Sequence, residues 1–304
     1  MRYRYYTADV FTDRIFGGNP LAVFPDARGV PEARMQQVAR EFNISETVFV
    51  LPPESGAHTR RLRIFTPAAE LPFAGHPTVG CAYVLAAIGD VQLAGEETRI
   101  VFEEGAGPVP VSIRAAAGRP VFTQLTAPRP PEAGPPPPAL ADIAAALSLP
   151  VADLAGGDWA PQAFSCGNPF LFVPLRDRGV LARARIDHAK WAERIASYWA
   201  SSLFIFSRDP ERPGADVRAR MYPPALGIAE DSATVSAAAA ITGYLAARAG
   251  TRDGMLRWVI EQGVEMGRPS VLEVEADVRA GKVVAARVGG ASVLVTEGTM
   301  EIPA

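Results

Sequence analysis

A glycine turn that runs into a helix is predicted at Phe73-Ala74-Gly75-His76-Pro77-Thr78-Val79-Gly80-Cys81. Pro77 suits the first position of a helix, because its ring fixes a helical φ and its missing N–H costs nothing there. Residues 79–88 are apolar on every side, and a helix without a polar face belongs in a protein core. The N-terminus of this helix would present backbone N–H groups and the positive end of the helix dipole, which attract an anion such as a carboxylate.

His76 stands at that N-terminus, where a lone histidine could simply cap or pack against the helix. The arrangement, however, occurs twice. Gly18-Asn19-Pro20 has a counterpart in Gly167-Asn168-Pro169, and Thr78-Val79 has one in Thr234-Val235, at nearly the same spacing. Recurrence of the same motifs in the same order indicates a duplicated domain. We therefore predict an α+β fold of two pseudo-symmetric domains, each a curled, mostly antiparallel sheet around a buried central helix.

A proline-rich segment, 127–138, marks the boundary between the two domains, because polyproline is semi-rigid and does not pack inside a helix or sheet. We expect an N-terminal α+β domain at 1–127 and a C-terminal one at 128–304, and the last strands of the chain are candidates to complete the first domain. If the domains face each other, both helix N-termini open on one cleft, and such clefts are preferred ligand sites.

The composition narrows the classes of partner. The chain has 304 residues and a formal net charge of -3, so it lacks the basic stripe expected of a nucleic-acid-binding protein. The N-terminus shows no secretory h-region and no apolar run is suited to span a bilayer, so we expect a cytoplasmic protein without a membrane partner. The two cysteines fit a reducing compartment. The partner that we expect is a small carboxylated substrate, because two positive helix N-termini on one cleft would hold such an anion.

Glu46, His76 and Asp231 form the candidate titrating set. A carboxylate in a partly dry cleft can remove a C–H proton and return it elsewhere on the same face, which is an isomerisation that needs no cofactor. His76 and Asp231 could hold the substrate and relay protons. Plain alternatives remain at this point: His76 and either Asp231 or Ser232 can be helix caps, and Glu46 can be a solvated charge at a strand end.

The sequence resembles the PhzF-like phenazine biosynthesis family, relatives of diaminopimelate epimerase. The stretches that carry the resemblance span most of the chain and are Gly18–Val23, Ser45–Thr47, Phe73–Thr78, Gly227–Asp231 and Gln262–Ser270. The resemblance implies a diaminopimelate epimerase-like fold with an active site between the domains. It also implies an activity similar to trans-2,3-dihydro-3-hydroxyanthranilate isomerase, in which Glu46 shuttles the C3 proton.

The family's functional residues carry over position by position. The resemblance implies that Glu46 transfers the proton and that Gly75, His76, Asp231 and Ser236 bind or orient the substrate. We predict Glu46, His76 and Asp231 as the catalytic residues, and we predict a second set that binds the substrate. That set consists of Asn19, Ser45, Gly75, Val235 and Ser236. It implies no metal or cofactor, and it implies a homodimer only by analogy with relatives.

Two positions depart from the family's second motif, which usually reads Glu-Asp-Pro-Ala-Thr-Gly-Ser. Ser232 replaces the proline and Val235 replaces the glycine. Glycine allows a positive φ and a close approach of the backbone to a ligand, whereas valine adds a side chain. We therefore expect a reshaped pocket. The alternative function is a catalytically altered small-ligand-binding protein on the same fold.

Other chemistries have weaker support in the residues. The related epimerases use two facing cysteines, but Ala74 stands where the first would be, and Cys81 and Cys166 lie elsewhere in the motif order. The histidines lack zinc-ligand spacing with either cysteine. A hydrolase built from Ser236, His76 and Asp231 would lack the Gly-x-Ser-x-Gly elbow. A kinase or an oxidoreductase would need a glycine-rich phosphate loop, which the sequence does not show.

Overall fold

The computed structural model describes residues 1–303, and these form two compact units. Unit 1 consists of Met1–Thr126 together with the chain from Gly289 onward, and unit 2 consists of Ala127–Val288. The last strand of the chain therefore lies with the first unit. Of the helices within residues 1–303, none has the length and apolar character required to cross a membrane.

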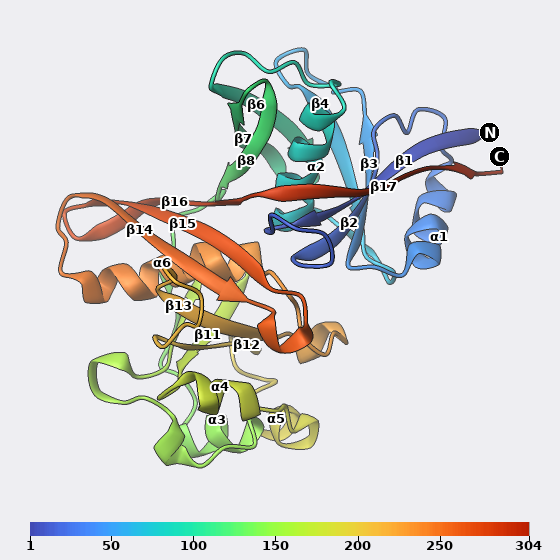
Figure 1. Cartoon of the computed structure of the whole chain (residues 1–304). Helices are drawn as coiled ribbons and strands as arrows, with labels where there is room; N and C mark the ends of the chain where they lie inside the picture. Colours follow the sequence, from blue (N-terminus) through green and yellow to red (C-terminus); the bar gives the residue numbers. More distant parts are fainter. Residues whose placement is uncertain (304) are drawn as a thin grey trace. The chain divides into compact units, whose positions relative to one another are not determined.

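Unit 1 contains a mostly antiparallel sheet (Figure 1). Its strands are β1 (Arg2–Val10), β2 (Asn19–Phe24), β3 (Glu46–Leu51), β4 (Arg60–Phe65), β5 (Glu70–Leu71), β6 (Glu97–Glu104), β7 (Gly107–Ala116), β8 (Arg119–Thr126) and β17 (Ser292–Glu301). Antiparallel pairing joins β17 to β1 to β2, β3 to β4 to β5, and β6 to β7 to β8. Parallel pairs β2–β3 and β4–β6 link these groups.

The helix α2 (Gly75–Ala87) is the centre of unit 1. It contacts β1, β2 and β3 as well as β7, β8 and β17, so strands far apart in the pairing order meet on one helix and the sheet curls around it. Gly80 allows this close approach, because a Cβ there would lie 2.5 Å from Val10 Cγ2 and 2.6 Å from Leu21 Cδ2. The prediction of a helix buried on every side is confirmed.

The helix α1 (Glu32–Phe42) covers the other face of the first strands. Its Met35 and Val38 join a core cluster that includes Phe24, Phe49 and Phe65 from three neighbouring strands. Because successive side chains of a strand point to opposite faces, strands covered by α1 on one face and α2 on the other are apolar on both.

Unit 2 has the strands β9 (Glu132–Ala133), β10 (Gln162–Ser165), β11 (Pro169–Pro174), β12 (Ser202–Ser207), β13 (Val217–Tyr222), β14 (Gly254–Gln262), β15 (Ser270–Arg279) and most of β16 (Lys282–Gly290), whose last two residues belong to unit 1. Its α-helices are α3 (Leu140–Ala146), α4 (Arg178–Arg183), α5 (His188–Arg194) and α6 (Val235–Ala249). Short 3-10 turns occur at Val151–Asp153, Gly157–Trp159, Pro224–Leu226 and Val264–Met266.

The strand pairing of unit 2 repeats that of unit 1. Along β10, β11, β12, β13, β14 and β15 the pairs are antiparallel, parallel, antiparallel, parallel and antiparallel. The series β1, β2, β3, β4, β6 and β7 has the same pattern. The helix α6 follows β13 as α2 follows β4, and its Gly243 sits against Phe164 of β10 as Gly80 sits against β1. The predicted pseudo-symmetric α+β fold is confirmed.

The structure corrects the predicted helix caps. The helix α2 begins at Gly75 with Ala74 as the N-cap, so His76 lies inside the first turn and Pro77 is the third helical residue. The helix α6 begins at Val235 with Thr234 as the N-cap. Asp231 and Ser232 precede that cap, and Asp231 forms a bridge to β13 instead. The predictions that His76, Asp231 or Ser232 caps a helix were wrong, because α2 begins one residue before His76 and the extended backbone before α6 continues as far as Thr234.

Candidate active site

Unit 1 gathers three of the motifs at the starts of β2, β3 and α2. The parallel pairing of β2 with β3 places Leu21 opposite Glu46. Gly18 makes the preceding turn with a φ of 62°, and a Cβ there would lie 2.2 Å from the Val10 carbonyl oxygen. That position therefore requires glycine. The turn buries Asn19, whose Oδ1 accepts a hydrogen bond of 2.7 Å from the Ser45 hydroxyl.

Glu46 and His76 face each other in unit 1. The His76 Nε2 lies 3.2 Å from Glu46 Oε2, in a geometry that is not aligned for a hydrogen bond at that nitrogen. The imidazole donates its other ring hydrogen to the Pro20 carbonyl. Burial lowers the pKa of His76 to about 3, because the side chain is only 6% exposed and the imidazolium would lose its hydration. At neutral pH His76 is therefore an uncharged imidazole.

Glu104 is a buried carboxyl group beneath the start of α2. Its Oε1 accepts a hydrogen bond of 2.6 Å from the Thr78 hydroxyl, and the carboxyl also accepts the Ala74 N–H. Burial raises the pKa of Glu104 to about 8, although both hydrogen bonds act in the opposite direction. The turn that carries Gly75 and His76 thus rests on an acid that is mostly protonated at neutral pH.

Unit 2 presents Asp231 immediately before α6. The Asp231 Oδ2 accepts a hydrogen bond of 2.6 Å from the Thr234 hydroxyl, and its backbone N–H donates to the Met221 carbonyl at 3.0 Å. The Gln262 side chain, at the end of β14, donates to the Asp231 carbonyl at 2.8 Å. The turn that carries the carboxylate is therefore hydrogen-bonded to both β13 and β14.

The structure also places the two remaining predicted residues at the start of α6. Val235 is the first helical residue and is 3% exposed, while Ser236 is half-buried. Val235 has no positive φ. Valine at this position therefore fits the helical backbone without the strain that a positive φ would cause.

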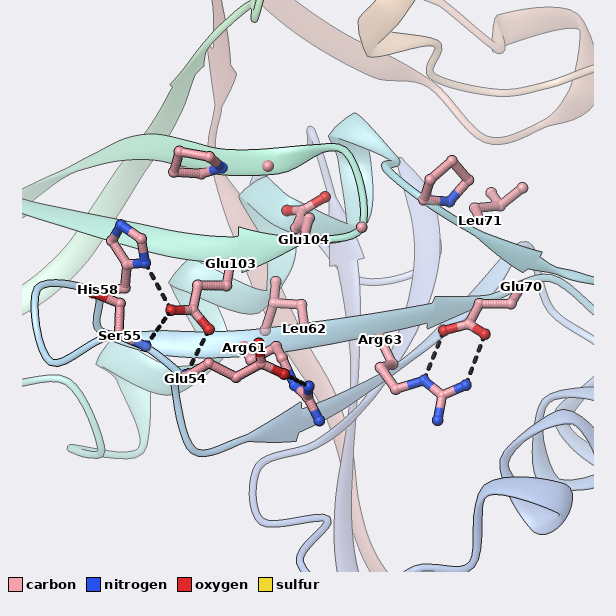
Figure 2. Close-up of a pocket in the computed structure, with 14 residues that line it drawn as sticks. Glu54, Ser55, His58, Arg61, Leu62, Arg63, Glu70, Leu71, Glu103 and Glu104 are labelled. Atoms are coloured by element: carbon pink, nitrogen blue, oxygen red, sulfur yellow. Dashed lines mark hydrogen bonds and ion pairs between the residues drawn. The ribbon is translucent and has the colours of Figure 1, made fainter.

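A cavity of about 820 Å³ lies elsewhere in unit 1, between β4 and the hairpin of β6 and β7. Figure 2 shows two ion pairs along it, Arg63 with Glu70 and Arg61 with Glu54, and a hydrogen bond of 2.7 Å between His58 Nδ1 and Glu103 Oε1. Glu104 is part of its lining, but Glu46 and His76 are not. Because its cations are already neutralised by carboxylates, we do not assign the substrate to this cavity.

The cysteines are poorly suited to proton transfer. Cys81 and Cys166 are both buried, and burial raises the pKa of each thiol, to about 12 for Cys166. A thiol acts as a base or nucleophile only as thiolate. Within residues 1–303, no group of three or more His, Cys, Asp or Glu side chains is placed to hold a metal ion.

Five of the eight predicted site residues therefore lie in unit 1 and three in unit 2. Glu104, Thr234 and Gln262 were not predicted. For Glu104 a signal existed, because the alternation of β6 places it in phase with the buried Ile100 and Phe102. Gln262 belonged to a stretch of the family resemblance that carried no assigned role.

Comparison with known proteins agrees with this fold. The family described as phenazine biosynthesis-like protein, PhzC-PhzF, matches residues 8–298. An uncharacterized isomerase of Mesorhizobium japonicum is 40% identical, covering 98% of each chain. The trans-2,3-dihydro-3-hydroxyanthranilate isomerase of Pseudomonas aeruginosa is 33% identical, covering 97% of this chain and 98% of its own. The crystal structure of a PhzF-family protein of Bacillus anthracis has a TM-score of 0.89 at 24% identity, covering 99% of this chain and 100% of its own.

The fold and these similarities define an isomerase with the α+β fold of the PhzF family. The chain belongs to the phenazine biosynthesis-like family, PhzC-PhzF.

Proposed function

We propose that this chain is a cofactor-independent isomerase that moves a proton on a small carboxylated metabolite, with Glu46 as the general acid and base. The observation that carries the proposal is the Glu46–His76 pair. Because the ring N–H of His76 is used by the Pro20 carbonyl, an uncharged His76 has a lone pair on Nε2. That lone pair lies 3.2 Å from a carboxyl oxygen of Glu46. Two acceptors this close repel each other, so the pair favours a proton on the Glu46 carboxyl group, which must turn to align that proton with Nε2.

A proton held at this pair supports acid–base chemistry at Glu46. In the acid form, Glu46 delivers the proton to one carbon, and in the base form it removes one from another, so no external redox partner is needed. His76 orients the carboxyl group and accepts the hydrogen bond of its acid form.

The proposed substrate carries a carboxylate. The first N–H groups of a helix have no partner within the helix, and they favour an anion. We assign substrate binding to Asn19, Ser45 and Gly75 in unit 1. In unit 2, we assign substrate binding to Val235 and Ser236 and a substrate-orienting catalytic role to Asp231. The relative that isomerises trans-2,3-dihydro-3-hydroxyanthranilate suggests that compound as the first substrate to test.

The proposal is tested with that compound in D₂O. We expect the wild-type product to contain one solvent-derived deuterium, and Glu46→Gln to lower kcat by about 10²- to 10⁴-fold, the usual contribution of a general acid–base group. Glu54→Gln is the matched control, because Glu54 is a surface carboxylate paired with Arg61. Glu46→Gln activity within a few-fold of wild type would contradict the proposal.

The second candidate, a binding protein without catalysis, was motivated by Val235. The structure gives this second candidate less support, because Val235 has a helical backbone and its side chain is buried in α6. A ligand that binds tightly and is recovered without deuterium would favour this candidate. We also propose a cytoplasmic homodimer from the family resemblance, and sedimentation of the purified chain tests the dimer.

A further inference from the structure

The stretch that begins at Gln262 has no part in the reaction proposed above, yet its first residue is directed at the site. Gln262 is fully buried at the end of β14. Its Nε2 donates to the Asp231 carbonyl at 2.8 Å and to the Thr234 hydroxyl at 3.0 Å. Its Oε1 accepts the Thr234 N–H at 3.2 Å. These three hydrogen bonds all go to the turn that carries the Asp231 carboxylate.

The hydrogen bonds have a fixed direction. An amide nitrogen can only donate, so the Thr234 hydroxyl must accept from Gln262 with a lone pair. Its own hydrogen is then directed to Asp231 Oδ2, which lies 2.6 Å away. The Thr234 N–H fixes which end of the Gln262 amide is the oxygen. The result is a chain of donors from Gln262 through Thr234 to the Asp231 carboxylate.

The backbone of the same stretch packs against this turn. Gly263 has a φ of 74°, and a Cβ there would lie 2.7 Å from the Ser232 carbonyl oxygen and 2.5 Å from the Arg268 carbonyl oxygen. Glycine is therefore required for both conformation and space. The Gln-Gly pair brings the end of β14 into direct contact with the turn that precedes α6.

Two buried arginines hold the neighbouring segments. Arg218 donates to Glu265 at 2.9 Å and lies 3.5 Å from Glu261, which fixes the chain on both sides of Gln262. Arg220 forms two hydrogen bonds with the Glu230 carboxylate, at 2.9 and 2.7 Å. Because charge-assisted pairs are stronger than neutral hydrogen bonds, the turn is anchored at its start as well as at its end.

We propose that Thr234 and Gln262 are positioning residues that hold the Asp231 carboxylate in one orientation for the isomerisation. The inference rests on the proposed function, because it gives Asp231 a role in that reaction. It goes further by assigning a purpose to the Gln262–Ser270 stretch and to the hydroxyl of an N-cap residue that makes no side-chain capping bond.

Thr234→Val tests the proposal, because valine keeps the shape and removes the hydroxyl. With trans-2,3-dihydro-3-hydroxyanthranilate as the probe, we expect kcat to fall by about 10- to 100-fold, the size of one hydrogen bond to a charged group, with KM changed by less than about threefold. Thr234→Ser should restore kcat to within about threefold of wild type, because it returns the donor.

Thr242→Val is the matched control. Thr242 is a fully buried threonine of the same helix, and its hydroxyl donates to the Ala239 carbonyl at 2.6 Å. We expect this variant to lose stability but to keep kcat within about twofold. The proposal is overturned if Thr234→Val keeps wild-type kcat, or if Thr234→Ser is as impaired as Thr234→Val.

A second measurement does not depend on turnover. Gln262→Leu should speed amide hydrogen exchange at residues 231–235 by about tenfold or more and leave exchange in β1 and β2 unchanged. Unchanged exchange at the turn would overturn the anchoring role of Gln262. Wild-type turnover without deuterium uptake would instead contradict the proposed function, so the two failures are distinguishable.

Discussion

At the scale of single residues, burial gives two groups of unit 1 unusual proton affinities. His76 has a pKa lowered to about 3 and Glu104 a pKa raised to about 8, both through loss of hydration. The two groups are neighbours in the fold, because Glu104 accepts a hydrogen bond from the hydroxyl of Thr78, which lies two residues after His76. Both side chains are therefore uncharged at neutral pH, which keeps fixed charge away from the start of α2.

Glu104 gives the free energy of unfolding a pH dependence. Its folded pKa of about 8 exceeds the usual 4.5 of glutamate, so between these values the folded chain keeps a proton that the unfolded chain releases. Stability supplied by Glu104 is therefore present below pH 4.5 and is lost as the pH rises to 8. We expect the free energy of unfolding of Glu104→Gln, measured in urea, to rise relative to that of wild type as the pH is raised from 6.5 to 8.

The neighbouring carboxylate is the control for that prediction. The N–H groups of Glu54 and Ser55 and the side chain of His58 lower the pKa of Glu103 to about 2. Its folded and usual values both lie below pH 5, so Glu103→Gln should shift stability by the same amount at pH 6.5 and pH 8. Equal pH slopes for wild type and Glu104→Gln would contradict the assignment of a proton to Glu104.

At the scale of elements, the two central helices approach their sheets through glycine. Gly80 of α2 and Gly243 of α6 each leave less than 3 Å for a Cβ, against β1 and β2 in unit 1 and against Phe164 of β10 in unit 2. The sequence predicted both helices as buried because they lack a polar face. It did not predict their first residues, because cap positions depend on where the extended chain before them leaves the sheet.

We expect Gly80→Ala to lower the free energy of unfolding by about 1–3 kcal/mol, the usual cost of overpacking a core. This cost exceeds the gain of about 1 kcal/mol in helix propensity, because the Cβ would clash with both Val10 and Leu21. Gly56→Ala is the control, because a Cβ at that exposed position would meet nothing within 4 Å, and it should change stability by less than about 0.5 kcal/mol. A stabilised Gly80→Ala variant would show that α2 has more room than the structure gives it.

At the scale of the whole molecule, the chain returns to its first unit at the end. The last strand, β17, pairs with β1 along its length, and Ile302 is buried in the cluster that contains Tyr3 and Phe24. The motif repeat predicted two similar domains, but closure of unit 1 by residues from the C-terminus depends on long-range pairing that no local pattern encodes. From the sequence, the last strands are therefore only candidates to complete unit 1.

Ile302→Ala tests this closure. We expect a loss of about 2–4 kcal/mol in the free energy of unfolding, typical of a buried isoleucine. Hydrogen exchange should quicken in β1 and α1 and stay unchanged in β11 and β12. Val284→Ala, at a side chain that is 43% exposed, is the control and should change stability by less than about 0.5 kcal/mol. Faster exchange in β11 and β12 alone would contradict the place of Ile302 in unit 1.

The candidate site was predicted in part. Sequence motifs selected Glu46 and His76 as members of one set, and the structure brings their side chains within 3.2 Å. Their catalytic roles stay predictions. The residues that hold the site were harder to predict. Gln262 is not part of an alternating apolar pattern, and Thr234 lies within the helix if Asp231 or Ser232 is taken as its cap. Such residues are defined by hydrogen bonds between distant segments, which a single sequence does not display.

Solvent deuterium uptake at Glu46 tests the central claim most directly. Wild-type enzyme and Glu46→Gln are each incubated with trans-2,3-dihydro-3-hydroxyanthranilate in D₂O, and the product mass and labelled carbon are read by mass spectrometry and NMR. We predict one deuterium per product in the wild type and turnover lowered by about 10²- to 10⁴-fold in Glu46→Gln. Labelled product formed by Glu46→Gln at nearly the wild-type rate would contradict the account.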